Sequence, residues 1–207
     1  DQAYFVRTGP NGFPYVFGQT SGPYPVQGGT YQNANSGQFI EKLSYDLDRR
    51  LFSTVVGAGS GRPELSPTAF MVDACGRIYL SGWFGIKNHD YHPGAFPRER
   101  ILGFPISSDA VQTDTDGSDF YIVVYEPDMK GLRYATYFGG QTQPTPPGIA
   151  DEGDHVDGGS SRFSPDGIIY QSICGACNFD TYPTSPGAYG SYEQHRMGNS
   201  SSLCSNA

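Results

Sequence analysis

The stretch Ala69-Phe70-Met71-Val72-Asp73-Ala74-Cys75-Gly76-Arg77-Ile78-Tyr79-Leu80-Ser81-Gly82-Trp83 decides the fold. Two apolar runs flank a short segment that ends in glycine, which predicts a β-hairpin. The same plan occurs in residues 4–18, around Gly9-Pro10-Asn11-Gly12, and in residues 161–172, around Pro165-Asp166-Gly167. In Asn-Gly and Asp-Gly turns both central residues can adopt positive φ. Each segment is therefore predicted to be a strand, a tight turn and a second strand.

A second pair of strands follows the first two hairpins. Residues 38–43 match 119–124 and, after a polar turn, residues 51–57 match 134–140. One unit is thus four antiparallel strands, which is the pattern of a propeller blade. The third repeat has only its first two strands. The sequence therefore predicts an all-β protein made of β-propeller blades, incomplete, with about two and a half blades.

The expected boundaries divide one propeller domain, residues 1–207, into its blades. Blade one covers residues 3–61, blade two residues 66–150, and partial blade three residues 151–207. Closed propellers usually have about four to eight blades, so this piece should expose raw strand edges that invite pairing. Further blades or other copies of the chain are therefore expected partners. Phenylalanines are expected to recur at equivalent strand positions of the repeats, which favours packing between blades over a platform for a ligand: Phe5, Phe17, Phe39, Phe52, Phe70, Phe120 and Phe163.

Composition and charge exclude several classes of protein. The net charge is −8 and no basic stripe is present, so a nucleic-acid partner is not expected. No run reaches the roughly 18 apolar residues of a membrane helix, so membrane insertion is not expected. An acidic surface is compatible with cations, neutral glycans or proteins. The composition, rich in turn-forming residues and in Asn, Ser and Gly, favours an extracellular location.

Several segments resemble one family of repeats. The strand Tyr134-Ala135-Thr136-Tyr137-Phe138-Gly139-Gly140, the loop at residues 179–189, its looser copy at 105–112 and the segment at 154–163 carry the resemblance. They are similar to the SBBP-type β-propeller repeats of large secreted Bacteroidota proteins with gliding-motility-associated C-terminal domains. The resemblance implies export by the type IX route and a place at the cell surface or outside the cell. It is specific for fold and says little about activity.

Two acidic loops flank the second half of blade two. Asp114, Asp116 and Asp119 precede its third strand, whereas Asp151, Asp154 and Asp157 lie in the loop that joins the last strand of blade two to the first strand of blade three. Both loops should emerge on one face, since they connect strands at the same end of the blade. Oxygen-rich loops with glycine are what Ca²⁺ uses, but neither loop has the spacing of an EF-hand. Turn-forming aspartates that accept backbone N–H groups are favoured over a calcium site, and no other cofactor is indicated.

Histidines and the single tryptophan have structural and functional interpretations. His89 and His92 lack a third ligand, which favours a solvated loop over a zinc site. For His155, a hydrogen-bonded corner is favoured over a ligand contact. Trp83 is either part of the core or a stacking surface for a sugar, and the core is favoured.

The four cysteines are separated by the blade geometry. Cys174, Cys177 and Cys204 should share one face, whereas Cys75 lies in a turn at the opposite end of its blade. A strand of about seven residues spans over 20 Å, and disulfide-bonded Cα atoms lie within about 7 Å. Cys204 is therefore predicted to pair with Cys174 or Cys177, without Cys75. A Cys174–Cys177 bridge and four free thiols are the alternatives.

No catalytic residue stands out. The chain has no Gly-x-Ser-x-Gly segment, and the glycine-rich residues 57–61 have no helix after them to receive a phosphate. The sequence therefore predicts a noncatalytic extracellular module for adhesion, matrix formation or binding of proteins or polysaccharides. Insertions at residues 84–118 and 175–203 would form the contact surface, because loops on a rigid scaffold often carry function. A carbohydrate-binding or carbohydrate-active propeller and a self-assembling subunit of a fibre or sheath are the alternatives.

Overall fold

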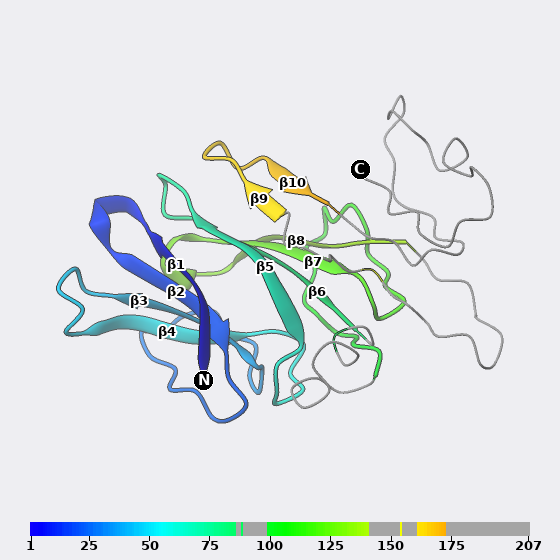
Figure 1. Cartoon of the computed structure of the whole chain (residues 1–207), viewed down its shortest axis with the longest axis horizontal. Coiled ribbons are helices and arrows are strands. Elements are labelled where there is room, and N and C mark those ends of the chain that lie inside the picture. Colours follow the sequence, from blue (N-terminus) through cyan, green and yellow to red (C-terminus); the bar gives the residue numbers. More distant parts are fainter. Residues whose placement is uncertain (86–87, 89–98, 141–153, 155–160, 173–207) are drawn as a thin grey trace.

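The computed structural model describes residues 1–85, 88, 99–140, 154 and 161–172, and they form two four-stranded sheets and a hairpin (Figure 1). The first sheet consists of β1 (Gln2–Thr8), β2 (Pro14–Gln19), β3 (Gln38–Leu43) and β4 (Arg50–Val56). The second consists of β5 (Leu65–Val72), β6 (Ile78–Phe84), β7 (Phe120–Tyr125) and β8 (Leu132–Phe138). The hairpin consists of β9 (Ser161–Phe163) and β10 (Ile169–Gln171), and two short 3₁₀ turns are η1 (Pro10–Gly12) and η2 (Pro127–Met129).

The strands of each sheet are paired in sequence order, and every pair is antiparallel. The prediction of an all-β chain with four-stranded antiparallel sheets is therefore confirmed. The described residues do not form a closed ring of sheets. None of the described helical segments is long and apolar enough to cross a membrane.

The first turn of each repeat has the same hydrogen bonds. The N–H groups of Gly9, Asp73 and Ser164 each donate to the carbonyl four residues later, at 2.9, 3.0 and 2.9 Å. The closing glycine has a φ near +80° in all three turns, which only glycine adopts without strain. The expectation of positive φ at both central residues holds for Asn11-Gly12, but Asp166 has no positive φ.

This shared turn defines which residues correspond in the three repeats. The second residue of each second strand is a tyrosine: Tyr15, Tyr79 and Tyr170. Val6 corresponds to Phe70 and to Ser161. Phe5 therefore corresponds to Ala69, and the expected recurrence of phenylalanine at equivalent positions is wrong by one residue at β1 and β5. A shift of one residue moves a side chain to the opposite face of a strand.

Packing between the sheets is centred on their first strands. β1 contacts β5, and β5 contacts β9. The ring of Phe17, fully buried, lies 6.3 Å from that of Phe5 and 5.4 Å from that of Phe70 in the second sheet. A ring of the second sheet, Tyr79, lies 5.6 Å from Phe163 in the hairpin. Aromatic rings therefore join successive repeats, as expected of side chains that bury much apolar area.

Polar contacts also join the first two sheets. The Gln19 side-chain amide donates to the Leu65 carbonyl at 2.6 Å, and the Tyr31 N–H donates to the Met129 carbonyl at 2.6 Å. The Lys42 ammonium lies 2.7 Å from the Asp128 carboxylate. These contacts bring the turn between β7 and β8 onto the first sheet.

The loop between the second and third strands covers the outer strand in both sheets. In the first sheet, Gln27 exchanges backbone hydrogen bonds with Ser53 of β4 at 3.0 and 3.2 Å. In the second sheet, Ser107 and Gln112 bond along β8, where Ser107 N–H donates to the Ala135 carbonyl at 3.0 Å. The expectation of raw edges is therefore wrong for β4 and β8, because loops occupy the groups that another strand would use.

Candidate functional site

Two of the predicted acidic residues meet at the end of β8. A Cβ atom added to Gly139 would lie 2.2 Å from Asp119 Oδ1 and 2.1 Å from Asp154 Oδ2, so both carboxylates press on this glycine. Their side chains are 0 and 2 % exposed. The Asp154 N–H donates to the Ser118 carbonyl at 2.8 Å, and the Gly140 N–H donates to Asp154 Oδ2 at 2.7 Å. The structure therefore brings one residue from each acidic loop to the same place.

The neighbouring aspartates have separate roles. Asp116 accepts the Ser118 N–H at 2.9 Å, which is the turn-forming role favoured from the sequence, and Asp114 is exposed. Two carboxylates buried side by side need hydrogen-bond donors, a shared proton or a cation nearby. Within the described parts of the chain, no three His, Cys, Asp or Glu side chains are grouped as metal ligands. Asp119 and Asp154 are thus the pair that would contribute to a calcium site, which stays a prediction.

A similar carboxylate in the first sheet was not identified from the sequence. Glu64 is fully buried, and its two oxygens accept the N–H groups of Ala58 at 2.7 Å and Ser60 at 2.6 Å. Its Oε2 lies against Gly57, as Asp154 lies against Gly139. Burial raises the pKa of the Glu64 carboxyl, and the hydrogen bonds from Ser60 oppose the shift. The sequence feature that could have identified Glu64 is its position, directly before a strand and shortly after the glycine-rich residues 57–61.

The second carboxylate distinguishes the two sheets. Asp119 corresponds to Gly37, and not to Gln38 as the match of residues 38–43 with 119–124 predicts. The carbonyls of Asp119 and Gly37 accept the N–H groups of Phe84, the last residue of β6, and of Thr20, which follows β2. A Cβ atom on Gly37 would lie 2.0 Å from the backbone of Arg62. The first sheet therefore has no room for a side chain where the second sheet has a carboxylate. Both sheets thus have a buried acid that accepts N–H groups of the loop after the fourth strand, Glu64 in the first and Asp154 in the second. Only the second sheet has a further carboxylate beside it, that of Asp119.

The remaining predicted residues fall into two groups. Trp83 is 6 % exposed and packs with Phe120, in line with the favoured core role. Cys75 is an exposed free thiol in its turn. The others lie outside the described residues: His89, His92, Asp151, His155, Asp157, Cys174, Cys177 and Cys204.

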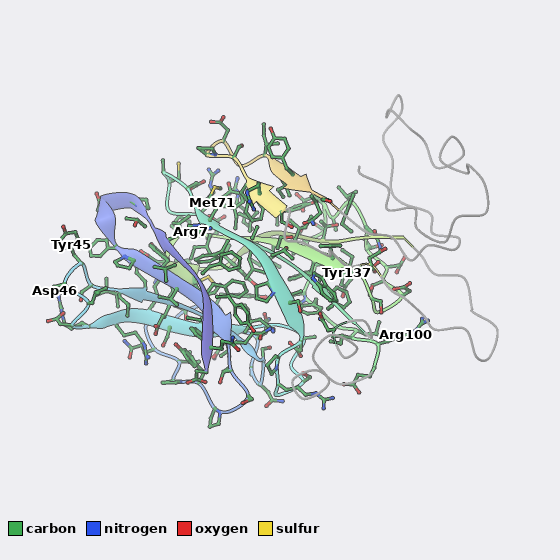
Figure 2. All side chains as sticks on the ribbon, in the orientation of Figure 1. Arg7, Tyr45, Asp46, Met71, Arg100 and Tyr137 are labelled. Carbon is green, nitrogen blue, oxygen red and sulfur yellow. The ribbon has the colours of Figure 1, made fainter. Side chains whose placement is uncertain are left out.

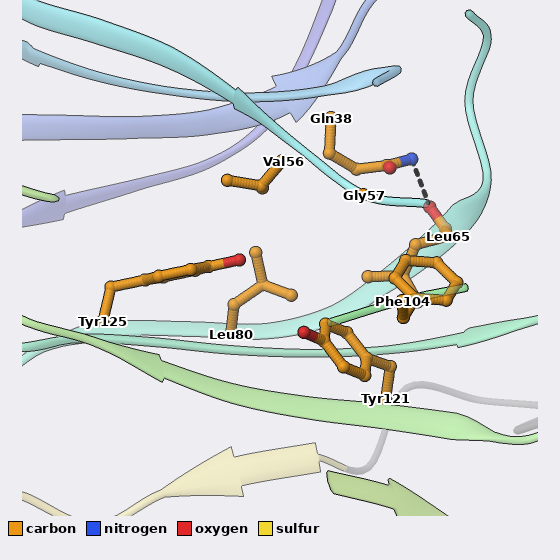
Figure 3. Close-up of a pocket in the computed structure, with 8 residues that line it drawn as sticks. All are labelled: Gln38, Val56, Gly57, Leu65, Leu80, Phe104, Tyr121 and Tyr125. Atoms are coloured by element: carbon orange, nitrogen blue, oxygen red, sulfur yellow. Dashed lines mark hydrogen bonds between the residues drawn. The ribbon is translucent and has the colours of Figure 1, made fainter. Parts of the chain in front are cut away.

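A small cavity of about 10 Å³, which has room for about one water molecule, lies between the first two sheets. The Gln38 amide reaches it from the first sheet and the hydroxyl groups of Tyr121 and Tyr125 point toward it from the second (Figure 3). Burial raises the pKa of both tyrosines well above the ordinary value. The cavity is smaller than the roughly 300–1,000 Å³ of typical ligand pockets. It is therefore not the binding site of an organic ligand.

Replacing Gly139 with alanine is expected to lower the free energy of unfolding by about 2 kcal/mol, because the new methyl group would displace two buried carboxylates. Denaturant unfolding monitored by fluorescence measures the change. Gly131→Ala is the matched control, since nothing lies within 4 Å of its Cβ position. Equal stability of the two variants would contradict the tight packing of Asp119 and Asp154 on Gly139.

Comparison with known proteins identified no relative: no family model, curated protein or solved structure matches the chain.

Proposed function

We propose that the chain is a noncatalytic extracellular β-propeller module that binds a protein or polysaccharide at a bacterial cell surface. Two like sheets follow one another with their first strands in contact, and the hairpin begins a third repeat in the same way. Such succession supports blades arranged around an axis. The extracellular location is supported by the resemblance to secreted propeller repeats and by the acidic, turn-rich composition.

The loop from residue 99 to residue 119 carries the binding proposal. Its Leu102 and Val111 side chains are 63 and 67 % exposed. The loop is nevertheless fixed, since the Tyr121 hydroxyl donates to the Pro105 carbonyl at 2.5 Å and the Gln112 N–H donates to Thr136 Oγ1 at 2.9 Å. A fixed loop that exposes apolar side chains is suited to contact a partner.

Screening the protein on glycan and surface-protein arrays, with and without Ca²⁺, tests this proposal. For the partner found, Leu102→Asp and Val111→Asp are expected to weaken binding by about tenfold or more, since a charge would enter an apolar contact. Tyr45→Ser, at an exposed turn of the other sheet, is the control and should bind normally. Unchanged binding by all three variants would place the contact surface elsewhere. A requirement for Ca²⁺ that Asp119→Asn removes would assign the carboxylate pair to a calcium site.

The carbohydrate-active alternative predicts a different outcome. A glycosidase pair leaves about 5–9.5 Å between its carboxyl groups for the sugar and water, whereas Asp119 and Asp154 meet at one glycine and are both buried. This geometry favours a structural or ion-binding role for the pair. Hydrolysis of a polysaccharide that Asp119→Asn abolishes would overturn the noncatalytic proposal.

A further inference from the structure

The equivalent tyrosines make a repeated contact with the following repeat. Tyr79 is 7 % exposed and its ring lies 5.6 Å from Phe163 of the hairpin. Tyr15 is 2 % exposed, and a Cβ atom on Gly9 would meet both the Tyr15 ring, at 2.4 Å, and the Val72 side chain, at 3.2 Å. Val72 and Phe163 hold the same position in their repeats, directly before the first turn. Each of these tyrosines is therefore buried where the next first strand arrives.

The third tyrosine of the series is exposed. Tyr170 in β10 is 58 % exposed, and Ile168, at the end of the same turn, is 54 % exposed. On the paired strand, Phe163 packs toward the second sheet. Gln171 accepts a hydrogen bond from Ser81 of the second sheet at 3.1 Å. Because side chains alternate along a strand, Tyr170 faces away from the second sheet. We call Ile168 and Tyr170 the tail patch.

The opposite end of the array has the complementary surface. Val6 of β1 is 58 % exposed, and Thr8 on the same face is exposed as well. Val6 corresponds to Phe70, which is 2 % exposed and lies against Phe17 of the preceding sheet. Thr8 corresponds to Val72, which lies beside Tyr15. Val6 and Thr8, the head patch, thus hold the positions that receive a preceding repeat.

We propose that the tail patch of one molecule docks on the head patch of a second copy of this chain. The contact would repeat the one that already joins the sheets within the chain: Tyr170 would cover Thr8 and Val6 as Tyr15 approaches Val72. Two different surfaces meet in such a contact, so the association is head-to-tail and adds copies in one direction until a ring closes. The inference rests on the packing of the repeats and not on ligand binding by the 99–119 loop.

The turn between β3 and β4 supports the direction of this contact. Leu47 has φ +64°, close to the +54° of Met129 at the corresponding place in the second sheet. Met129 is fully buried and its carbonyl accepts the Tyr31 N–H of the preceding sheet, whereas Leu47 is 63 % exposed. Figure 2 shows the neighbouring Tyr45 and Asp46 at the outer tip of this turn. In the second sheet this turn contacts the first sheet through Met129. The equivalent turn of the first sheet, around Leu47, is exposed.

The face of the first sheet that carries the head patch is polar over β3. The proposed contact between copies is therefore limited to β1 and the turn between β3 and β4. Glu41 accepts hydrogen bonds from Tyr24 at 2.9 Å and from Arg50 at 2.8 Å. The corresponding residue of the second sheet is Val123, which is fully buried against the first sheet. Docking of the described hairpin, β9 and β10, on β1 alone would leave Glu41 uncovered, which fits this division.

Sedimentation velocity of the chain tests the proposal. A contact made by so few residues is expected to be weak, so the concentration should range from about 1 µM to about 1 mM. The mean mass should rise with concentration. Val6→Asp and Tyr170→Asp should each raise the dissociation constant by about tenfold or more, since each places a charge in the contact. Val111→Asp, an equally exposed valine outside both patches, should associate like the original chain.

Mixing the two variants distinguishes head-to-tail docking from a symmetric contact. Val6→Asp retains a tail patch and Tyr170→Asp retains a head patch, so an equal mixture should form dimers and nothing larger. Monomers at every concentration of the original chain, or no dimer in the mixture, would overturn the proposal. The ligand-binding proposal is tested separately: Val111→Asp should lose the surface ligand and keep self-association, whereas Val6→Asp should do the reverse.

Discussion

Phe17→Ala is expected to lower the free energy of unfolding by about 4 kcal/mol, because it removes a fully buried ring and leaves a cavity. The ring lies between Phe5 of its own sheet and Phe70 of the next. Its loss should therefore weaken both the first sheet and the contact between the sheets. Urea unfolding monitored by circular dichroism measures the change.

Tyr45→Ala is the control for this substitution, since that side chain is 77 % exposed. It should change the free energy of unfolding by no more than about 0.5 kcal/mol. A Phe17→Ala variant as stable as the Tyr45→Ala variant would contradict the packing of the two sheets described above. Separate unfolding transitions for the two sheets in the Phe17→Ala variant would instead show how strongly this ring couples them.

Glu64→Ala is expected to lower the free energy of unfolding by about 3 kcal/mol, because the N–H groups of Ala58 and Ser60 would lose their hydrogen bonds to a carboxylate. Glu64→Gln keeps the shape but places an NH₂ group where an oxygen accepts an N–H, so it should cost less than alanine and still destabilise. Urea unfolding at neutral pH measures both. A change below about 0.5 kcal/mol for alanine would contradict the role of Glu64.

Glu64 also predicts a dependence of stability on pH. Its folded pKa lies above the ordinary value of 4.5, so the native state binds the proton more tightly than the unfolded state does. The stability contributed by this proton is full below the unfolded pKa and is lost as the pH rises through the folded pKa. Relative to Glu64→Gln, the original chain should be more stable near about pH 4 than near about pH 7.5. The opposite trend would contradict the direction of the shift.

The sequence was sufficient to predict the strands because turn residues and apolar runs act locally. Asn11-Gly12, Gly76 and Gly167 mark the three hairpin turns, and the strands lie where the apolar runs are. The register of equivalent positions between the repeats was not predictable from the pattern of apolar residues alone. Phe5 and Phe70 looked equivalent, yet the shared hydrogen bonds of the turns place them one residue apart and so on opposite faces.

Features that depend on distant backbone were not predicted. Glu64 was overlooked because its partners are two N–H groups in a loop, which have no signature in the sequence. The covered edges of β4 and β8 were missed for a similar reason, since Gln27 and Ser107 look like ordinary loop residues. Asp119 and Asp154 were placed on one face correctly, because that step required only the order of the strands.

The loops along β4 and β8 also bear on how readily the protein would aggregate. A strand with unpaired N–H and C=O groups is a template for amyloid-like growth, and here the template is occupied by residues such as Gln27 and Ser107. A protease that cut the loop before β3 or β7 would leave each sheet nearly intact but expose its outer backbone to other molecules. We therefore expect these loops to protect the protein against fibril formation, and limited proteolysis of them to promote aggregation.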